Sequence, residues 1–268
     1  MEFVSGHWDP QGKRWIGGAQ DNDVQVGPVN GTTRALGVVM GDGTVTAVDA
    51  KASPPRLFGC TQNLGNFADD DRPGRRRLDD DESYGFGFYQ EGKGLVGIPL
   101  LDWFDVVQFP FFSQPYALNS VNGTQILLFA DDGARAGSKL QKRGLYVIDV
   151  PRDVTKPKQI KTPTLEVSMD GAVYDIVAGG ATDGKPDASV IVALNDTHLL
   201  VRSKATKGAL VARPLPTRFA RPVIFDYVEG DDGFEYILGP TSHDKTVSLA
   251  VSPASCPRGE SIASAAPR

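Results

Sequence analysis

Short apolar runs that end at turn-forming residues dominate this sequence. Runs of about four to eight residues rich in Val, Ile, Leu and aromatic side chains recur, each broken by Gly, Pro, Asn or Asp. Such runs are typical of β-strands, and no segment shows the sustained 3.6-residue period of an amphipathic helix. The sequence therefore predicts an all-β protein. The predicted strands are residues 15–20, 36–40, 45–48, 56–61, 86–89, 125–129, 145–150, 173–178, 190–194, 199–202, 223–227, 235–238 and 247–251.

The order of runs and turns repeats along the chain. Similar units begin near residues 45, 115, 173 and 222, and a unit is about 50–60 residues long. In the unit that begins near 115, the last predicted strand covers residues 158–163. Four short antiparallel strands per unit are typical of a β-propeller blade, whose two faces are buried by its neighbours. We therefore predict a β-propeller-like array of four-stranded antiparallel blades, incomplete at about four to five blades.

One charged segment falls between the predicted strands. Residues 69–82 read DDDRPGRRRLDDDE and contain almost no apolar side chain to bury. We expect an exposed loop over about 66–94 that interrupts the blades, with its arginines at 75–77 cut first by a protease. The sequence predicts a single propeller-like domain over 1–252 and a disordered C-terminal tail over 253–268.

Composition excludes some classes of partner. The formal net charge is −5 and 40% of the residues are hydrophobic, which suits a globular chain and argues against nucleic acid as a main partner. No apolar run approaches the roughly 18 residues needed to cross a bilayer, so we expect no membrane insertion. Residues 1–20 lack the apolar core of a signal peptide. Cys60 and Cys256 leave a disulfide open, although two free thiols are the favoured interpretation, and the compartment stays open.

Three stretches resemble a known family of propellers. "WIGGAQDN", then "GDGTVTAVD" and "PPRLFGCTQNLG", is similar to the bacterial-neuraminidase-repeat propellers, which include sortilin-like ectodomains and xyloglucanase-type glycosidases. The resemblance covers most of the chain as a strand pattern. The aspartate box of that family is absent in full form, and "SMDGAVY" comes nearest. Such propellers usually have six or more blades, so the resemblance implies a fragment or a divergent member.

Polar residues at two predicted strand ends are the candidate site. Gln20, Asp21 and Asn22 follow one strand, and Asp42 lies between two glycines before another. One interpretation is structural, because Asp and Asn cap tight turns through backbone amides. The other is ligand binding at the mouth of a propeller. A surviving glycosidase would need two carboxylates roughly 5–10 Å apart, and Asp21 with Asp42 is the candidate catalytic pair.

Other motifs carry weaker signals. Three glycosylation sequons begin at Asn30, Asn122 and Asn195, although Asn-Gly is also a favoured hairpin turn. "GGATDGKP", residues 179–186, lacks the final hydroxyl residue and the helix of a phosphate-binding loop. Residues 69–80 mimic the spacing of a calcium loop, but three arginines within it oppose a cation. The histidines are scattered and "SHD" at 242–244 is a polar hairpin, so we expect no metal and no cofactor.

These observations favour a non-catalytic binding or scaffold module of the propeller type over an enzyme. The alternative is a glycoside hydrolase of the xyloglucanase or sialidase type. A sialidase would also need clustered arginines for its carboxylate ligand, whereas the arginines here gather mainly at 75–77. The expected partners are a carbohydrate or a protein, with self-association through the open ends of the blade array.

Overall fold

The chain folds into β-sheets that belong to two compact units. The computed structural model describes residues 3–28, 36–39, 41–62, 85–100, 103–104, 115–130, 143–168, 173–182, 185–195, 198–202, 208–214, 222–230 and 233–240. Contacts are dense within unit 1, Met1–Leu118 with Gly123–Asp170, and within unit 2, Asn119–Asn122 with Gly171–Arg268. The sequence predicted one domain over 1–252. The C-terminal boundary of that domain and the predicted tail 253–268 lie outside the described residues.

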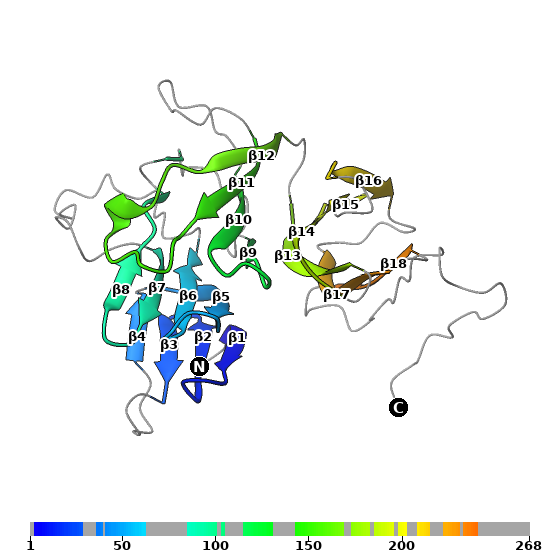
Figure 1. The fold of residues 1–268 in the computed structure, drawn as a ribbon. Helices are drawn as coiled ribbons and strands as arrows, with labels where there is room; N and C mark the ends of the chain where they lie inside the picture. The colour runs from blue at the N-terminus through cyan, green and yellow to red at the C-terminus, as the bar shows by residue number, and fades with distance from the viewer. Residues whose placement is uncertain are drawn as a thin grey trace, which may run out of the picture. The chain divides into compact units, whose positions relative to one another are not determined.

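The first sheet of unit 1 is an antiparallel meander in chain order. Its strands are β1 (Phe3–Asp9), β2 (Arg14–Ala19), β3 (Val24–Gly27) and β4 (Leu36–Val39). They are the blue strands of Figure 1. The sequence predicted β2 and β4 but not β1 or β3. Ser5, His7 and Asp9 break the apolar pattern of β1.

The second sheet repeats this arrangement. Its strands are β5 (Gly43–Asp49), β6 (Arg56–Thr61), β7 (Phe86–Gln90) and β8 (Gly94–Gly97), again in chain order. The predicted loop 66–94 therefore ends too late, because β7 buries Phe86 and Phe88 and is the third strand of this blade instead of an interruption of the array. The charged run 69–82 lies outside the described residues.

The third sheet completes unit 1. Its strands are β9 (Tyr116–Leu118), β10 (Gln125–Ala130), β11 (Gly144–Asp149) and β12 (Thr164–Ser168). The fourth strand was predicted at 158–163, which is wrong. A 3-10 turn at Pro157–Gln159 occupies the start of that range, since Pro157 favours the first position of a helical turn. The strand begins only after Pro163.

Unit 2 contains one more four-stranded meander and a hairpin. The meander strands are β13 (Asp175–Thr182), β14 (Lys185–Leu194), β15 (His198–Arg202) and β16 (Val211–Pro214). The hairpin strands are β17 (Pro222–Gly230) and β18 (Gly233–Pro240). A parallel pairing at Thr182 and Glu229 joins β13 to β17, so the sheet order is β16-β15-β14-β13-β17-β18.

The all-β prediction is confirmed. The described strands form a propeller-like array of four-stranded antiparallel blades, with the β17–β18 hairpin in addition. The predicted starts near 45, 115, 173 and 222 each match the first strand of a blade or hairpin. Within the described residues there is no α-helix, and no helix there is long and apolar enough to cross a membrane. The predicted strand 247–251 lies outside the described residues.

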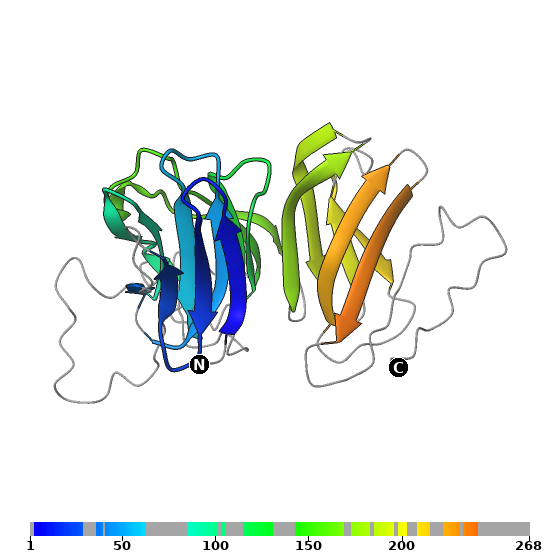
Figure 2. The same ribbon diagram turned by 90° about the horizontal axis from the view of Figure 1, so that it is seen from below.

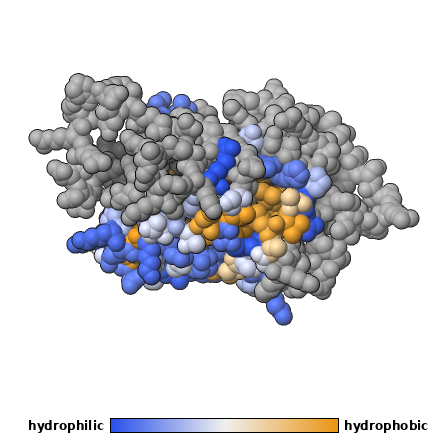
Figure 3. Space-filling view, turned by 90° about the horizontal axis from the view of Figure 1, so that it is seen from above, coloured by the Kyte–Doolittle hydropathy of each residue, from blue (hydrophilic) through white to orange (hydrophobic). Residues whose placement is uncertain are grey.

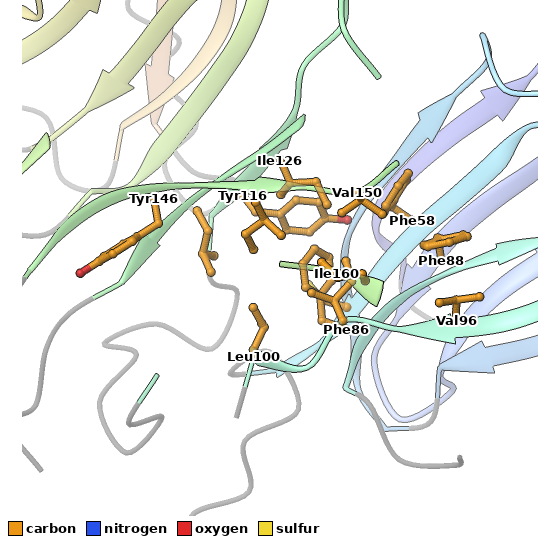
Figure 4. Packing of buried hydrophobic residues seen from close by; sticks show 14 of the residues in the cluster. Phe58, Phe86, Phe88, Val96, Leu100, Tyr116, Ile126, Tyr146, Val150 and Ile160 are labelled. Atoms are coloured by element: carbon orange, nitrogen blue, oxygen red, sulfur yellow. The ribbon is translucent and has the colours of Figure 1, made fainter. Parts of the chain in front are cut away.

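Two hydrophobic clusters hold the sheets of unit 1 together. One lies between the second and third sheets, where the rings of Phe86 and Tyr116 are 4.7 Å apart and those of Phe58 and Phe88 are 5.2 Å apart (Figure 4). The other lies between the first and second sheets and joins Ile16, Val24, Val26, Val38 and Val39 to Leu57. Every residue of β6 is buried, because Leu57 contributes to one cluster and Phe58 to the other. A strand sandwiched in this way has a continuous apolar run rather than an alternating one.

Candidate functional site

The predicted site residues lie in two connections that meet in unit 1. Residues 20–23 connect β2 to β3, and Gly41 with Asp42 leads into β5. The backbone of Asp21 has a φ of 57° and that of Asp23 a φ of 63°, in the left-handed region that Asp tolerates better than most residues. Gly41 has a φ of 118°, which favours glycine. Asp21 and Asp23 therefore bend the chain tightly between β2 and β3, and Gly41 bends it before β5.

Hydrogen bonds tie these two connections to each other. The Asp42 carboxylate accepts a bond from the backbone N–H of Asp21, with 2.8 Å between Oδ1 and N. The Asp23 carboxylate accepts from the N–H of Gly41 at 2.9 Å, and the N–H of Asp23 donates to the Gly41 carbonyl at 2.8 Å. The structure thus brings Asp21 and Asp42 together. It also adds Asp23, which the sequence interpretation missed because the Gln-Asp-Asn triplet ends one residue earlier.

The remaining predicted binding residues are bonded locally. The Asn22 amide Nδ2 donates to the Gln20 carbonyl at 2.9 Å, and the N–H of Asn22 donates to Ala19 at 3.2 Å. The side chains of Gln20 and Asp21 are exposed, whereas those of Asn22 and Asp42 are partly buried. The Gln20 amide and the Asp21 carboxylate therefore face solvent. The side chains of Asn22, Asp23 and Asp42 instead form the hydrogen bonds that hold the two connections.

Glycines let β2 and β5 approach closely beneath this turn. A Cβ on Gly18 would lie 1.9 Å from the carbonyl oxygen of Thr44, and one on Gly43 would lie 2.2 Å from the carbonyl oxygen of Asp23. Both contacts are with backbone atoms, which cannot move aside as a flexible side chain would. Gly43 is thus required for space, whereas Gly41 is required for its backbone conformation.

A second set of charged residues is buried at the ends of the β1–β2 and β5–β6 hairpins. Asp9 and Arg14 are paired in register, and Arg14 Nε lies 3.1 Å from Asp9 Oδ2. Asp9 Oδ1 also accepts from the N–H groups of Gln11 and Gly12, each at 3.0 Å. Arg14 Nη1 reaches Glu91 of the β7–β8 turn at 3.2 Å. This pair therefore closes its own hairpin and contacts the next blade.

The corresponding pair in the second blade is Asp49 with Arg56, which are also in register. Arg56 Nη2 lies 3.0 Å from Asp49 Oδ2 and donates to the Gly123 carbonyl at 2.7 Å. Arg56 Nη1 donates to the Val150 carbonyl at 2.8 Å, in the connection after β11 of the third blade. Burial lowers the pKa of Arg56, and the neighbouring Asp49 carboxylate opposes that shift.

These two pairs form a repeated blade-to-blade contact. In each, an aspartate ends the first strand of a blade and an arginine begins the second strand. The arginine reaches the connection between the third and fourth strands of the following blade. Arg152 of the third blade adds a bond of its own to Asp49 Oδ2 at 3.1 Å. The sequence interpretation missed both pairs, because a charged residue at the end of a short strand ordinarily indicates a solvated turn. The signal that could have found them is the Asp–turn–Arg order that the two hairpins share.

A polar contact also joins the first strands of the first two blades. Ser5 Oγ donates to the Thr44 carbonyl at 2.6 Å and lies 3.0 Å from Thr46 Oγ1. His7 Nδ1 lies 3.1 Å from the same hydroxyl. Desolvation lowers the pKa of His7 below its ordinary value of 6.5, so the ring favours its neutral form. A neutral ring can exchange a hydrogen bond with a hydroxyl in either direction.

Other candidates from the sequence have structural roles where the structure describes them. Asn195 Oδ1 accepts from the N–H of His198 at 2.6 Å, and the N–H of Asn122 donates to Asn119 at 2.8 Å, so both sequon asparagines lie in turns. Asn30 lies outside the described residues, as do the loop 69–80 and residues 242–244. Residues 179–186 run from β13 into β14, so a strand follows the glycine-rich segment.

The Cys60 thiol is free and fully buried on β6. Burial raises its pKa to about 12, which opposes thiolate chemistry. Cys256 lies outside the described residues. Across the described residues, no group of three or more His, Cys, Asp or Glu side chains is placed to hold a metal ion.

The described surface is mostly hydrophilic on the face seen from above, with a hydrophobic area toward its centre (Figure 3). The large hydrophobic side chains exposed in the described part of the chain are Trp8 at 57%, Leu95 at 39% and Val211 at 39%. Single exposed hydrophobic residues are normal, but an indole exposed to this extent is unusual.

Comparison with known proteins gives no family. No protein-family model matches the chain, and no curated protein matches its sequence significantly. The resemblance to bacterial-neuraminidase-repeat propellers therefore stays a prediction.

Proposed function

We propose that this chain is a non-catalytic binding or scaffold module of the propeller type. The observation that carries the proposal is the bond between the Asp42 carboxylate and the Asp21 N–H, at 2.8 Å. A glycosidase acid must hold or release a proton at a carboxyl oxygen, and its partner must face the substrate. Here one oxygen of Asp42 accepts a backbone bond that closes a turn, which suits a structural role better than a catalytic one.

The scaffold part of the proposal rests on the buried Asp–Arg pairs. Arg56 is completely buried and its guanidinium bonds to Asp49 and to three carbonyl groups of the third blade. A buried charge is costly unless it is paired and hydrogen-bonded, so this arrangement fixes the blades relative to each other within unit 1. A rigid support of this kind is what positions binding loops at strand ends.

The binding part rests on the exposed residues of the turn. Gln20 and Asp21 extend to solvent from a turn held by the bonds of Asp23 and Asp42. An amide and a carboxylate on a rigid turn can accept bonds from the hydroxyl groups of a sugar or from the N–H groups of a protein. A carbohydrate or a protein is therefore the proposed class of ligand.

The alternative function, a glycoside hydrolase of the xyloglucanase or sialidase type, is favoured by one observation. Asp21 and Asp42 are 21 residues apart in sequence but lie in contacting turns. Glycoside hydrolysis requires two carboxylates near each other, and each of these turns carries one aspartate.

Hydrolysis assays separate the two functions. The purified chain is incubated with xyloglucan, a mixed-linkage β-glucan and a sialoside, and reducing ends or free sialic acid are measured. We expect no turnover by the wild type. Turnover that Asp21→Asn or Asp42→Asn abolishes, with an unchanged circular dichroism spectrum, would establish the hydrolase instead. Asp149→Asn is the matched control, because Asp149 is an exposed carboxylate elsewhere in unit 1.

A further inference from the structure

The exposed cations described in unit 1 gather at one end of its strands. Neighbouring strands are antiparallel, so in each sheet the connections after the first and third strands lie at the same end. Figure 2 shows the blue turn between β1 and β2 beside the lighter blue turn between β5 and β6 at this end. We call the surface formed by the exposed cations of these connections the lysine end: Lys13, Lys51, Lys93, Arg152, Lys156, Lys158 and Lys161.

Hydrogen bonds join these connections into one surface. The side chain of Gln11 donates to the Ala50 carbonyl and ties the first hairpin tip to the second. The bonds of Arg56 to the connection after β11 tie the second tip to the third sheet. The Lys93 ammonium donates to the carbonyl of Arg152 in the same connection, at 3.4 Å. The lysine end therefore extends over all three sheets of unit 1.

The connection between β11 and β12 supplies four of the seven cations and is anchored to the core. Val154 and Ile160 are buried in the cluster between the second and third sheets. Gln159 Oε1 accepts from the N–H groups of Thr155 and Lys156, each at 2.8 Å. Buried anchors on both sides therefore hold the lysines between them on the outside of the connection.

The lysines set the charge of this end, because the buried charges beneath them are paired. Asp9 pairs with Arg14, and Asp49 with Arg56. Against the seven cations, the described part of this end exposes three acids: Glu91, Asp149 and Asp153. The lysine end is thus positive, although the formal net charge of the whole chain is −5. The aspartates of the polar turns lie at the opposite ends of β2 and β5.

Two exposed hydrophobic side chains flank the lysine end. Trp8 is 57% exposed and lies one residue before Asp9, where the first hairpin tip begins. Leu95 is 39% exposed and lies two residues after Lys93. Tryptophan is enriched where a membrane meets water, because its ring contacts lipid while its N–H keeps a polar partner. The lysine end therefore combines positive charge with side chains suited to a lipid surface.

The choice of lysine over arginine indicates the kind of anion. Six of the seven cations are lysines and one is an arginine. Arginine has a planar fork that suits fixed phosphate geometry and nucleic-acid recognition, whereas lysine is a point charge on a flexible stem. Flexible point charges suit the diffuse negative potential of a membrane leaflet that contains anionic lipid.

We propose that the lysine end binds the surface of an anionic phospholipid membrane, with Trp8 at the boundary between lipid and water. The lysines supply the attraction at a distance, and Trp8 and Leu95 supply the contact with lipid. Binding is peripheral, and the polar turns at the opposite end of the strands face away from the membrane. This proposal does not rest on the proposed function of those turns.

Co-sedimentation with vesicles tests the proposal. The purified chain is mixed with vesicles of phosphatidylcholine alone or with about 30% phosphatidylserine, at low and at physiological salt. We expect binding to the anionic vesicles only, and weaker binding as salt screens the charges. Tryptophan emission should shift to shorter wavelength when the wild type binds, and the shift should be smaller for Trp8→Phe.

Charge reversal distinguishes a localised surface from overall charge. One lysine near an anionic surface contributes about fivefold to the partition, so Lys158→Glu should weaken binding by at least about tenfold. Lys185→Glu is the matched control, because Lys185 is exposed in unit 2 and its reversal changes the net charge equally. We expect this control to bind as the wild type does. Melting curves establish that both variants are folded.

Three results would overturn the proposal. The first is no binding to the anionic vesicles at low salt, and the second is equal binding to neutral and anionic vesicles. The third is an equal loss of binding for Lys158→Glu and Lys185→Glu. Inorganic polyphosphate is titrated in parallel. If it binds in a manner that Lys158→Glu weakens while vesicles do not bind, the lysine end recognises a soluble polyanion instead of a membrane.

Discussion

Arg56 and Asp49 form an ion pair in the interior of unit 1, with Arg56 Nη2 3.0 Å from Asp49 Oδ2 and at most 1% of either side chain exposed. Removing two charges from water is costly, and attraction between them offsets the cost only where further hydrogen bonds satisfy the remaining atoms. The carbonyl groups of Gly123, Val150 and Pro151 supply those bonds. The pair therefore makes the second hairpin dependent on the third blade.

Arg56→Met should destabilise the protein strongly. The substitution leaves Asp49 buried beside the partly exposed Arg152 and removes the donor of three carbonyl groups, so we expect a loss of about 3–5 kcal/mol in the free energy of unfolding. Urea denaturation followed by tryptophan fluorescence measures the loss. Arg152→Met is the control, since Arg152 is 40% exposed and its removal should cost about 1 kcal/mol or less. Equal losses for the two variants would contradict this account.

Asp42→Ala should cost about 1 kcal/mol, because it removes the acceptor of the Asp21 N–H. Asp42→Asn retains an acceptor oxygen at that position and should lose less than half of that amount. The midpoints of thermal unfolding of the two variants, measured side by side, check the order. A larger loss for Asp42→Asn would mean that the charge of Asp42, rather than its hydrogen bond, stabilises the turn.

Gly18→Ala should prevent close contact between β2 and β5. The new methyl group would lie 1.9 Å from the Thr44 carbonyl oxygen, and the obstructing atoms are backbone. We expect a loss of about 3 kcal/mol or more, because overpacking here requires the strands to separate. Gly6→Ala provides the comparison, since its nearest neighbour would be 3.7 Å away. Stability is measured by chemical denaturation, and a neutral Gly18→Ala would show that the strands are further apart than described.

His7 should make stability depend on pH. Its pKa is lowered from 6.5 in the folded chain by desolvation, so the unfolded chain takes up the proton more readily. The stability contributed by the neutral ring is complete above pH 6.5 and falls as the pH drops below that value. Melting temperatures from pH 8 to pH 5 should therefore decline less steeply for His7→Gln than for the wild type. Titration of the His7 ring by NMR above 6.5 would refute the prediction.

The Cys60 thiol should not react in the native protein. Its pKa of about 12 keeps it protonated near neutral pH, and it is completely buried. In a Cys256→Ser background, we expect no labelling by Ellman's reagent at pH 8 in buffer and one equivalent in concentrated urea. Rapid labelling without urea would mean that β6 opens readily.

The strands could be predicted where burial on both faces left an unbroken apolar run. The range 56–61 was predicted and is the range of β6, because Leu57, Phe58 and Cys60 all lie in a core. Strand β1 could not be predicted in this way. Its polar residues Ser5 and His7 bond to Thr44 and Thr46 of the neighbouring blade, which is far away in sequence.

The turn that holds the candidate site was predicted in part. Asp, Asn and Gly reveal a turn by their local preferences, so Asp21 and Asp42 were recognised as turn residues. The Asp49–Arg56 pair was not recognised as a buried ion pair, because its burial depends on carbonyl groups of the third blade. A charged residue has no local feature that distinguishes a solvated position from one enclosed by distant strands.

The two hairpins that carry Asp–Arg pairs differ in the length of their turns. The pair encloses residues 10–13 in the first hairpin and residues 50–55 in the second, yet both aspartates remain in register with their arginines. The pair clamps the base of each hairpin, and the tip beyond it tolerates a change of length. For protein engineering, the first of these tips is therefore the better position for a grafted peptide, because Pro10, Gln11 and Lys13 are exposed there, whereas Ala52 in the second tip is buried.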